Sequence, residues 1–320
     1  MKQKNAAGHN IQSRLTASLL GVVGSFVLFA AYLVVPPIGI FSGVLAPFPV
    51  AYNRLVHGRT ASVIVLLGST TAVTGLFGIF AGSLYLGMCA MTGFFMPELL
   101  TRHVTASRAL FWTTAANLLI FVAGVVCYGV VSGTNLQQVL SAEVTESLKQ
   151  AVILYEKGGV SGEELDVVKR SMTTAAELLQ RLYPACITAL FVAIAGCNLL
   201  LIRKSTVTLC PHLLIGEFKT FRSPDLLVWP LILTGFALLL PDSLLTVPAL
   251  NLLLVICLVY FFQGMAVVSA MTAKNSVPSL LRVILYALLI IQPYLVALIT
   301  GIGLFDLWVD FRTPKTQENL

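Results

Sequence analysis

The chain has 320 residues, of which 57% are hydrophobic and only 11% are charged, with a mean hydropathy of +0.90. A soluble domain usually carries about 25% charged residues, so this composition excludes a water-soluble globular protein. The net charge of +6 comes from basic residues that lie mainly between apolar runs, so a lipid bilayer is the expected partner and nucleic acid is not.

Nine apolar runs follow one another along the chain, and most are long enough to cross about 30 Å of hydrocarbon as a helix. Their residues do not alternate between apolar and polar, as the strands of a membrane β-barrel would. The sequence therefore predicts an all-α, polytopic transmembrane helical bundle of about 8–9 spans within a single integral membrane domain, residues 1–320. The runs cover residues 15–35, 38–54, 61–80, 82–100, 107–131, 182–202, 225–246, 249–272 and 277–303.

The first run is about 21 residues long, which favours a retained helix over a cleaved signal peptide, whose apolar stretch is about 7 to 15 residues. Small residues recur every four positions in this run, at Ala17, Gly21 and Ser25. Such a face lets another helix approach closely. The approaching helix is either an internal neighbour or a separate membrane subunit.

The second run lies in a segment with four prolines, residues 36–59. Pro47 and Pro49 interrupt the helical hydrogen bonds, which predicts a kinked, broken or re-entrant helix. Non-helical backbone at membrane depth is tolerated where it is buried or lines a cavity. The segment is therefore a candidate ligand site, with Tyr52 and Asn53 at its inner end, and a kinked structural helix is the alternative.

Glu98 is the one carboxylate clearly within an apolar run. Ionisable side chains inside a membrane are costly, which makes Glu98 a candidate ligand-binding residue. Arg102 lies four residues later, so an ion pair between the two at the membrane surface is the structural alternative.

A polar insert, residues 132–181, separates the fifth and sixth runs of membrane-spanning length. The Gly158-Gly159 pair predicts a turn, and apolar residues recur near steps of three and four on both sides of it. We therefore expect an extracytoplasmic helical hairpin whose second helix continues into the sixth span. The two helices either pack on each other as a static unit or form a movable lid over an outward-facing site.

Four uncharged amide side chains lie within or near the spans, at Asn117, Asn198, Asn251 and Gln263. Amides in membrane helices often form hydrogen bonds between helices, which contribute about 0.6–2 kcal/mol each. Each amide is therefore expected to connect helices, and the four together are the available lining for a small-molecule pocket.

The last span ends in a segment of aromatic and charged residues. Aromatic rings gather at the membrane–water boundary, so the segment predicts an interfacial anchor whose charged groups reach water. A charged rim that contacts a ligand or a partner protein is the alternative. The aromatic residues are Phe305, Trp308 and Phe311, and the charged residues are Asp306, Asp310 and Arg312.

Basic residues collect on alternate segments between the spans, as they do on the cytoplasmic side of membrane proteins. With the N-terminus inside, the inner segments hold 13 of the 20 basic residues, whereas the short outer turns hold none. We therefore expect a multi-pass protein with a cytoplasmic N-terminus and, for nine spans, an outer C-terminus. The 13 residues are Lys2, Lys4, Arg14, Arg54, Arg59, Arg102, Arg108, Arg203, Lys204, Lys219, Arg222, Lys274 and Arg282.

Groups that membrane enzymes use for catalysis are not placed together in the spans. The four histidines fall in or beside the expected cytoplasmic loops, no HExxH motif is present, and the six cysteines form no CxxC pair. The sequence also contains no nucleotide-binding P-loop. We expect no enzyme activity, no metal site and no cofactor, and an ATP-driven cycle would need separate subunits.

Two segments, FKTFRSPDLLVWPLIL at 218–233 and GLFDLWVDFR at 303–312, together with the proline-rich segment near the start, resemble the YybS-like family of bacterial integral membrane proteins, a domain of unknown function. That family is distantly similar to the S components of energy-coupling-factor transporters, whose first helix docks on a coupling subunit through small residues. The resemblance implies a location in the bacterial cytoplasmic (inner) membrane. The chain departs from an S component because it is longer than the usual six spans and carries the insert at 132–181.

The sequence therefore predicts a non-catalytic membrane subunit that binds or helps to transport a small molecule, with a membrane coupling subunit as a possible partner through Ala17, Gly21 and Ser25. The alternative is a membrane scaffold or regulator that recognises another envelope protein. Such a scaffold would use the insert at 132–181 and the terminal aspartates.

Overall fold

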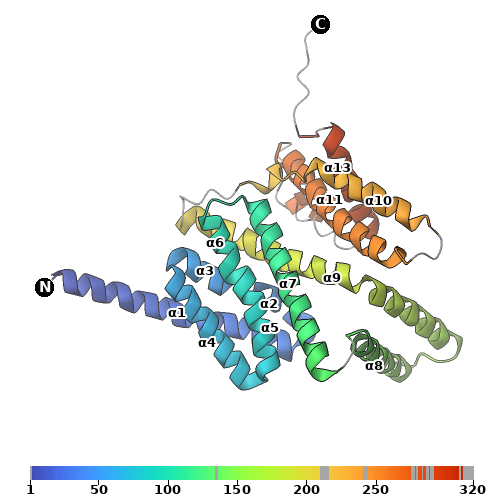
Figure 1. Ribbon diagram of the computed structural model, residues 1–320, viewed down its shortest axis with the longest axis horizontal. Helices are drawn as coiled ribbons and strands as arrows, with labels where there is room; N and C mark the ends of the chain where they lie inside the picture. The colour runs from blue at the N-terminus through green and yellow to red at the C-terminus, as the bar shows by residue number, and fades with distance from the viewer. Residues whose placement is uncertain are drawn as a thin grey trace, which may run out of the picture. The chain divides into compact units, whose positions relative to one another are not determined.

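In a computed structural model of the protein, all regular secondary structure among the described residues is helical, which confirms the all-α prediction (Figure 1). The chain divides into two compact units, and the prediction of a single membrane domain stays a prediction. Unit 1 comprises Met1–Leu136 and Leu190–Ile215, and unit 2 comprises Gln137–Ala189 and Gly216–Leu320. The structure describes residues 2–133, 136–209, 216–240, 244–274, 278, 280–282, 284–285, 288, 292–309 and 311–312.

Within these residues, six helices are long and apolar enough to cross a membrane. This number supports a polytopic membrane protein, whereas the predicted count of 8–9 spans is not confirmed. The six candidate spans are Leu15–Val34, Arg59–Phe77, Ile79–Thr101, Ala106–Ser132, Glu163–Ser205 and Thr246–Lys274.

Among the described residues, shorter helices lie at three of the nine apolar runs. The second run folds into α2 (Pro36–Leu45) and α3 (Phe48–Val56), which are separated by a break before Pro47. The seventh run contains α10 (Val228–Leu238), which has 11 residues, and α13 (Pro293–Val309), which has 17 residues, lies at the ninth. A helix rises about 1.5 Å per residue, so α10 spans about half of the hydrocarbon thickness.

Unit 1 is built around α1 (Lys2–Val34), which contacts α2, α3 and α4. Small polar side chains stabilise the packing of these helices: Ser69 of α4 donates to the Val22 carbonyl of α1 at 3.1 Å, and Ser62 of α4 donates to the Val50 carbonyl of α3 at 2.9 Å. The other helices of this unit, besides the last part of α9, are α4 (Arg59–Phe77), α5 (Ile79–Cys89), η1 (Ala90–Phe95), α6 (Met96–Thr101) and α7 (Ala106–Ser132).

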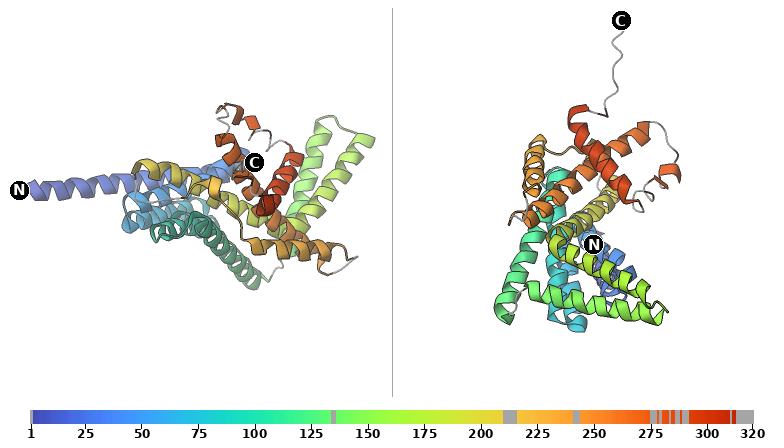
Figure 2. Two further views of the ribbon diagram at one scale, coloured as in Figure 1. Left: turned by 90° about the horizontal axis from the view of Figure 1, so that it is seen from above. Right: turned by 90° about the vertical axis from the view of Figure 1, so that its right-hand side faces the viewer.

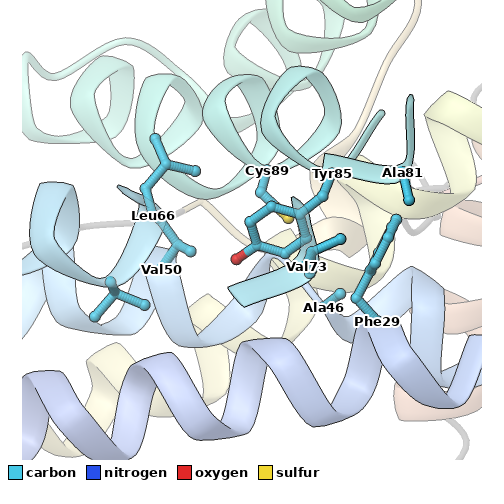
Figure 3. Packing of buried hydrophobic residues seen from close by; sticks show 9 residues of the cluster. Phe29, Ala46, Val50, Leu66, Val73, Ala81, Tyr85 and Cys89 are labelled. Atoms are coloured by element: carbon cyan, nitrogen blue, oxygen red, sulfur yellow. The ribbon is translucent and has the colours of Figure 1, made fainter. Parts of the chain in front are cut away.

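The core of unit 1 lies between α1, the α2–α3 pair, α4 and α5 (Figure 3). Phe29 and Tyr85 are fully buried there and meet edge to face, with ring centroids 5.1 Å apart. The Tyr85 hydroxyl lies 2.6 Å from Ser25 Oγ, so its polar atom is paired inside the core. The other members of the core are Ala46, Val50, Val65, Leu66, Val73, Ala81 and Cys89.

A short turn at the predicted glycine pair joins α8 (Leu136–Lys157) to α9 (Glu163–Leu209) (Figure 2). Gly159 has a φ of 91°, and Val160 N donates to the Tyr155 carbonyl at 3.1 Å. This bond is typical of a helix C-terminus that is followed by a residue in the left-handed conformation. Residues 163–189 of α9 belong to unit 2, and residues 190–209 belong to unit 1. The extracytoplasmic placement of the hairpin at 132–181 stays a prediction.

In unit 2, α11 (Thr246–Lys274) and α13 approach each other closely at two glycines. A Cβ added to Gly303 would lie 2.6 Å from the Gly264 nitrogen, and a Cβ added to Gly264 would lie 2.8 Å from Ile299 Cγ2. Larger side chains would therefore separate the two backbones. The close approach brings Asp306, which follows Gly303 by three residues, beside α11.

Gly303→Ala is expected to lower the free energy of unfolding by about 1–3 kcal/mol, because the new methyl group must push α13 away from α11. Gly301→Ala is the matched control, since no described atom lies within 4 Å of a Cβ at that position and alanine is the better helix former. Thermal unfolding in detergent, followed by circular dichroism, measures both variants. Equal stability of the two would contradict the close contact.

Candidate functional site

The helix is interrupted between α2 and α3, where Pro47 has no N–H with which to continue it, and backbone carbonyls beside the break bond to side chains of other helices. The Ala46 carbonyl accepts from Ser25 Oγ at 2.6 Å, and the Val44 carbonyl accepts from Asn198 Nδ2 at 2.8 Å. Side chains from α1 and α9 therefore satisfy backbone groups near the break. The prediction of an interrupted helix in this segment is confirmed.

A second irregular element, the π-helix η1, packs against α3. Met96 N donates to the Met91 carbonyl, five residues earlier. This wider turn precedes Pro97, whose ring would clash with the carbonyl of Gly93 in a regular helix. Gly93 also permits the contact with α3, since a Cβ there would lie 2.7 Å from Val50 Cβ. Two interrupted helices therefore touch in one core, and π-turns are frequent at functional sites.

Asn117 and Asn198 both connect helices, as the sequence predicts for amides in spans. Asn117 Nδ2 donates to Thr92 Oγ1 of η1 at 3.1 Å and to the Thr113 carbonyl at 3.1 Å. Asn198 Nδ2 donates to the Ile194 carbonyl at 2.7 Å in addition to its bond near the break. The amide nitrogens are thus fully engaged with protein groups.

Two buried amide oxygens, Asn53 Oδ1 and Asn198 Oδ1, accept no hydrogen bond from the described residues. Both side chains are at most 2% exposed, and an unpaired polar atom at such depth costs about 1–3 kcal/mol. Asn53 Nδ2 donates to the Pro49 carbonyl at 2.9 Å, which holds this amide in place. Tyr52 is half-buried, and its ring centroid lies 6.4 Å from that of His57.

The small face of α1 packs against internal neighbours. A Cβ on Gly21 would lie 2.6 Å from Asn53 Nδ2 and 2.8 Å from Val65 Cγ2, and Ser25 is fully buried. Ala17 is half-buried. Gly21 and Ser25 therefore serve the approach of α3, α4 and α5 within unit 1, and the docking of a separate subunit on this face stays a prediction.

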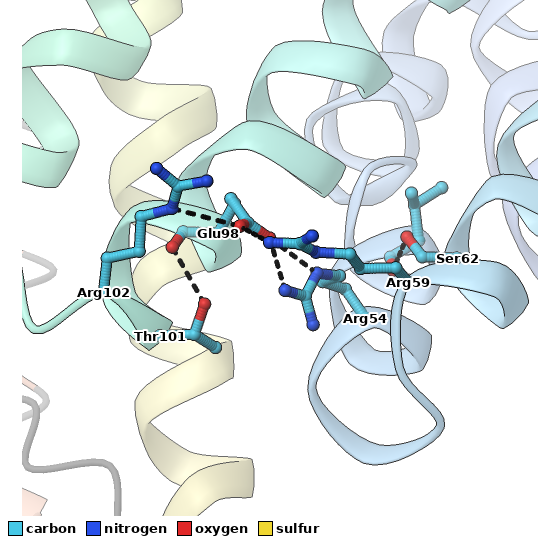
Figure 4. Close-up of polar contacts among 7 residues, drawn as sticks. Arg54, Arg59, Ser62, Glu98, Thr101 and Arg102 are labelled. Atoms are coloured by element: carbon cyan, nitrogen blue, oxygen red, sulfur yellow. Dashed lines mark hydrogen bonds and ion pairs between the residues drawn. The ribbon is translucent and has the colours of Figure 1, made fainter.

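Glu98 forms ion pairs with three arginines at one end of unit 1 (Figure 4). Its Oε2 accepts from Arg54 and Arg59, and its Oε1 accepts from Arg59 and Arg102. The bond from Arg102 Nε, at 3.2 Å, is the pair expected from a spacing of four residues. Sequence reasoning missed Arg54 and Arg59, which reach Glu98 from the two sides of the turn between α3 and α4.

Asn251 bridges an interruption in α9 within unit 2. Pro184 lies inside α9 and disturbs its hydrogen bonds. Asn251 Oδ1 accepts from Ala185 N at 2.9 Å, and Asn251 Nδ2 donates to the Arg181 carbonyl at 2.7 Å. In a regular helix Ala185 N would donate to this same carbonyl. The amide therefore connects the two backbone groups and joins α11 to α9, so both of its polar atoms are engaged.

Asn251→Ala is expected to lower the free energy of unfolding by about 1–3 kcal/mol, because the Ala185 N–H and the Arg181 carbonyl would lose their partner. The loss should shrink in a Pro184→Ala background, where the two groups can bond to each other. A double-mutant cycle based on thermal unfolding in detergent measures this coupling. An equal loss in both backgrounds would rule out the bridge.

Gln263, Asp306 and Arg312 form a buried polar network in unit 2. Gln263 Nε2 donates to Asp306 Oδ2 at 3.1 Å, and Gln263 Oε1 accepts from the Ser223 N–H at 3.0 Å and from its hydroxyl. Arg312 donates to Asp306 Oδ2 at 2.8 Å and to the Lys219 carbonyl at 2.9 Å. Through α11, the network ties together the two segments that carry the family resemblance.

The prediction that Asp306 reaches water is wrong, and the Arg312 side chain reaches water only in part. Asp306 is only 1% exposed, and the Arg312 side chain is 16% exposed. The pattern of the segment gives no sign of the polar partners that α11 and residues 219–223 bring to it. Sequence reasoning also missed Ser223, although a serine before a proline favours a turn. Asp310 lies outside the described residues.

A family model matches a segment of the chain that includes most of the residues described above. No match is found among curated proteins or among solved structures. A family model described as "Predicted membrane protein (DUF2232)" matches residues 23–307 and so covers the α2–α3 break, Glu98 and the contact between Gln263 and Asp306. This match and the six apolar helices together show that the protein is membrane-integral. The chain belongs to the DUF2232 family of predicted membrane proteins.

Proposed function

We propose that this protein is a non-catalytic membrane subunit that binds, or helps to transport, a small molecule in unit 1, where the α2–α3 break meets η1. The observation that carries the proposal is the pair of buried amide oxygens, Asn53 Oδ1 and Asn198 Oδ1, that accept no hydrogen bond from the described residues. A bound molecule with N–H or O–H donors would satisfy them.

The interrupted helices support the same role. In membrane transporters, discontinuous helices place backbone and side-chain polar groups at substrate sites near the bilayer midplane. Here the break before Pro47 and the π-turn at Gly93 lie in contact within one core. Protein donors already satisfy the Val44 and Ala46 carbonyls, whereas Asn53 Oδ1 and Asn198 Oδ1 have no donor among the described residues. The expected ligand class is a small molecule rich in hydrogen-bond donors.

The resemblance to YybS-like proteins, and at a distance to the S components of energy-coupling-factor transporters, also favours this role. In that arrangement the protein lies in the bacterial cytoplasmic (inner) membrane with its N-terminus in the cytoplasm. A separate coupling subunit supplies the energy, because the sequence carries no P-loop.

Thermal-shift screening of the purified protein in detergent, with small metabolites that carry hydrogen-bond donors, tests the proposal. A ligand should raise the Tm of the wild type, and its apparent affinity should fall about tenfold in Asn53→Ala and in Asn198→Ala. Asn251→Ala is the matched control, because both polar atoms of that amide already pair with α9.

Ligand stabilisation that persists in both Asn53→Ala and Asn198→Ala would place the ligand elsewhere and contradict the proposal. A screen in which no compound stabilises the wild type would also count against it. A hydrolytic or transferase activity that depends on Glu98 would refute the non-catalytic role.

A membrane scaffold or regulator that recognises another envelope protein is the second candidate. It is favoured by exposed apolar side chains on α8 and the first part of α9, which are between 48% and 69% exposed at Ile153, Leu154, Val167, Leu178 and Leu179. This role predicts no small-molecule shift. It also predicts that a protein partner is lost when a short linker replaces residues 135–180.

A further inference from the structure

Six basic residues of unit 1 whose side chains the structure describes lie at one end of its helices. Glu98 of α6 contacts Arg54, in the last turn of α3, and Arg59, at the start of α4. The ends of α3 and α6 and the starts of α4 and α7 therefore lie together. The last turns of α9 lie at the same end, because Ile202 packs in one cluster with Leu100. The connections at the other end, residues 34–36, 77–80 and 131–133, carry no charge. The basic residues at the shared end are Arg54, Arg59, Arg102, Arg108, Arg203 and Lys204.

The arginine cluster, defined as Arg54, Arg59 and Arg102 around Glu98, has an excess of positive charge. Three guanidinium groups and one carboxylate give a formal charge of +2. Each guanidinium has five N–H donors, and the bonds to Glu98 use five donors in all. More donors are gathered here than one carboxylate can accept from.

Two side chains of the arginine cluster are buried, and two are exposed. The side chains of Glu98 and Arg54 are each 11% exposed, whereas those of Arg59 and Arg102 are 62% and 68% exposed. Figure 4 shows the terminal nitrogens of Arg102 directed away from Glu98, and only Arg102 Nε bonds to the carboxylate. The buried pair therefore positions two exposed guanidinium groups that keep donors available.

The turn after α6 fixes the backbone at Arg102. His103 adopts a left-handed φ of 58°, and Val104 N donates to the Leu99 carbonyl at 3.1 Å. This pattern closes a helix C-terminus firmly. Arg102 therefore extends from a defined helix end and not from an open loop.

We propose that Arg59 and Arg102 bind a phosphate group at this end of unit 1, where the buried pair of Arg54 and Glu98 holds them in position. Guanidinium forks match the geometry of phosphate oxygens and can donate two parallel hydrogen bonds. Basic pockets between transmembrane helices bind anionic lipid headgroups in this way. The phosphate belongs either to such a headgroup or to a soluble phosphate ester, and the recognition chemistry is the same. The proposal does not rest on a ligand at the α2–α3 break.

The test titrates the purified full-length protein, in neutral detergent, with phosphatidylglycerol, with phosphatidylcholine as a zwitterionic reference, and with inorganic phosphate, and it follows the Tm. The variant Arg59→Gln/Arg102→Gln should bind the stabilising probe about tenfold more weakly or worse. The matched control Lys149→Gln/Arg170→Gln removes two basic side chains from α8 and α9 and should bind like the wild type. Both double variants lower the formal net charge from +6 to +4.

Stabilisation by phosphatidylglycerol alone identifies a lipid headgroup, and stabilisation by inorganic phosphate identifies a soluble source; both support the site. The proposal is overturned if neither probe raises the Tm, if the Arg59/Arg102 variant binds as tightly as the wild type, or if the control weakens binding equally. Should the double variant fail to elute as a folded species in gel filtration, the single variants Arg59→Gln and Arg102→Gln carry the test. Each is then expected to weaken binding about threefold, and unchanged binding in both would refute the site.

Discussion

Glu98→Ala is expected to lower the free energy of unfolding by about 3–5 kcal/mol, the typical cost of leaving a buried charge without its partner. Arg54 is only 11% exposed, so its guanidinium would remain inside unit 1 without a carboxylate. Arg59 would also lose the contact that fastens the start of α4 to α6. Unfolding of the purified protein in mixed detergent and sodium dodecyl sulfate measures the change.

Arg102→Ala is the matched control for Glu98→Ala. Its side chain is 68% exposed, and an exposed pair at a spacing of four residues contributes about 0.3–0.5 kcal/mol. Glu98→Gln should give an intermediate loss, because the amide oxygen still accepts a hydrogen bond but carries no charge. If Glu98→Ala costs no more than Arg102→Ala, the carboxylate does not hold the turn between α3 and α4.

Asp306→Ala is expected to cost a similar amount, about 3–5 kcal/mol. Asp306 is 1% exposed and accepts hydrogen bonds from Gln263, from Arg312 and from the Phe311 N–H at 3.3 Å. Its removal takes away a counter-ion of the largely buried Arg312 side chain. The end of α13 should then loosen from α11, and thermal unfolding in detergent should begin at a lower temperature.

Asp225→Ala is the control for the loss of an acidic side chain in unit 2, since Asp225 is exposed, and a change within about 0.5 kcal/mol is expected. A double-mutant cycle of Asp306→Ala with Arg312→Ala isolates the pair. We expect a coupling of about 1–3 kcal/mol, so that removing both costs clearly less than the sum of the single losses. Additive losses would show that the two side chains stabilise the protein independently.

The interrupted helix at residues 36–59 shows how much of the candidate site could be predicted. Proline removes a backbone donor whatever surrounds it, so the sequence identifies the interruption near Pro47. The sequence does not identify Ser25 and Asn198 as the donors to the Ala46 and Val44 carbonyls. These partners come from two other helices, and their meeting depends on how those helices pair.

Glu98 and Asp306 show where prediction from the sequence fails. The contact of Glu98 with Arg102 could be predicted because both residues lie on one helical face. Its contact with Arg54 joins residues 44 positions apart, and the contact of Asp306 with Gln263 joins residues 43 apart. No local pattern relates such distant positions.

The sequence by itself determined that the chain is helical and lies in lipid, because composition, the length of apolar runs and proline chemistry act locally. Only the tertiary structure decided which polar side chains meet: Glu98 with three arginines, Asn251 with the interruption at Pro184, and Asp306 with Gln263 and Arg312. The physical reason is that a membrane helix is apolar both where it faces lipid and where it faces its neighbours. Hydrophobic periodicity therefore does not reveal how each helix is rotated or which helices pair.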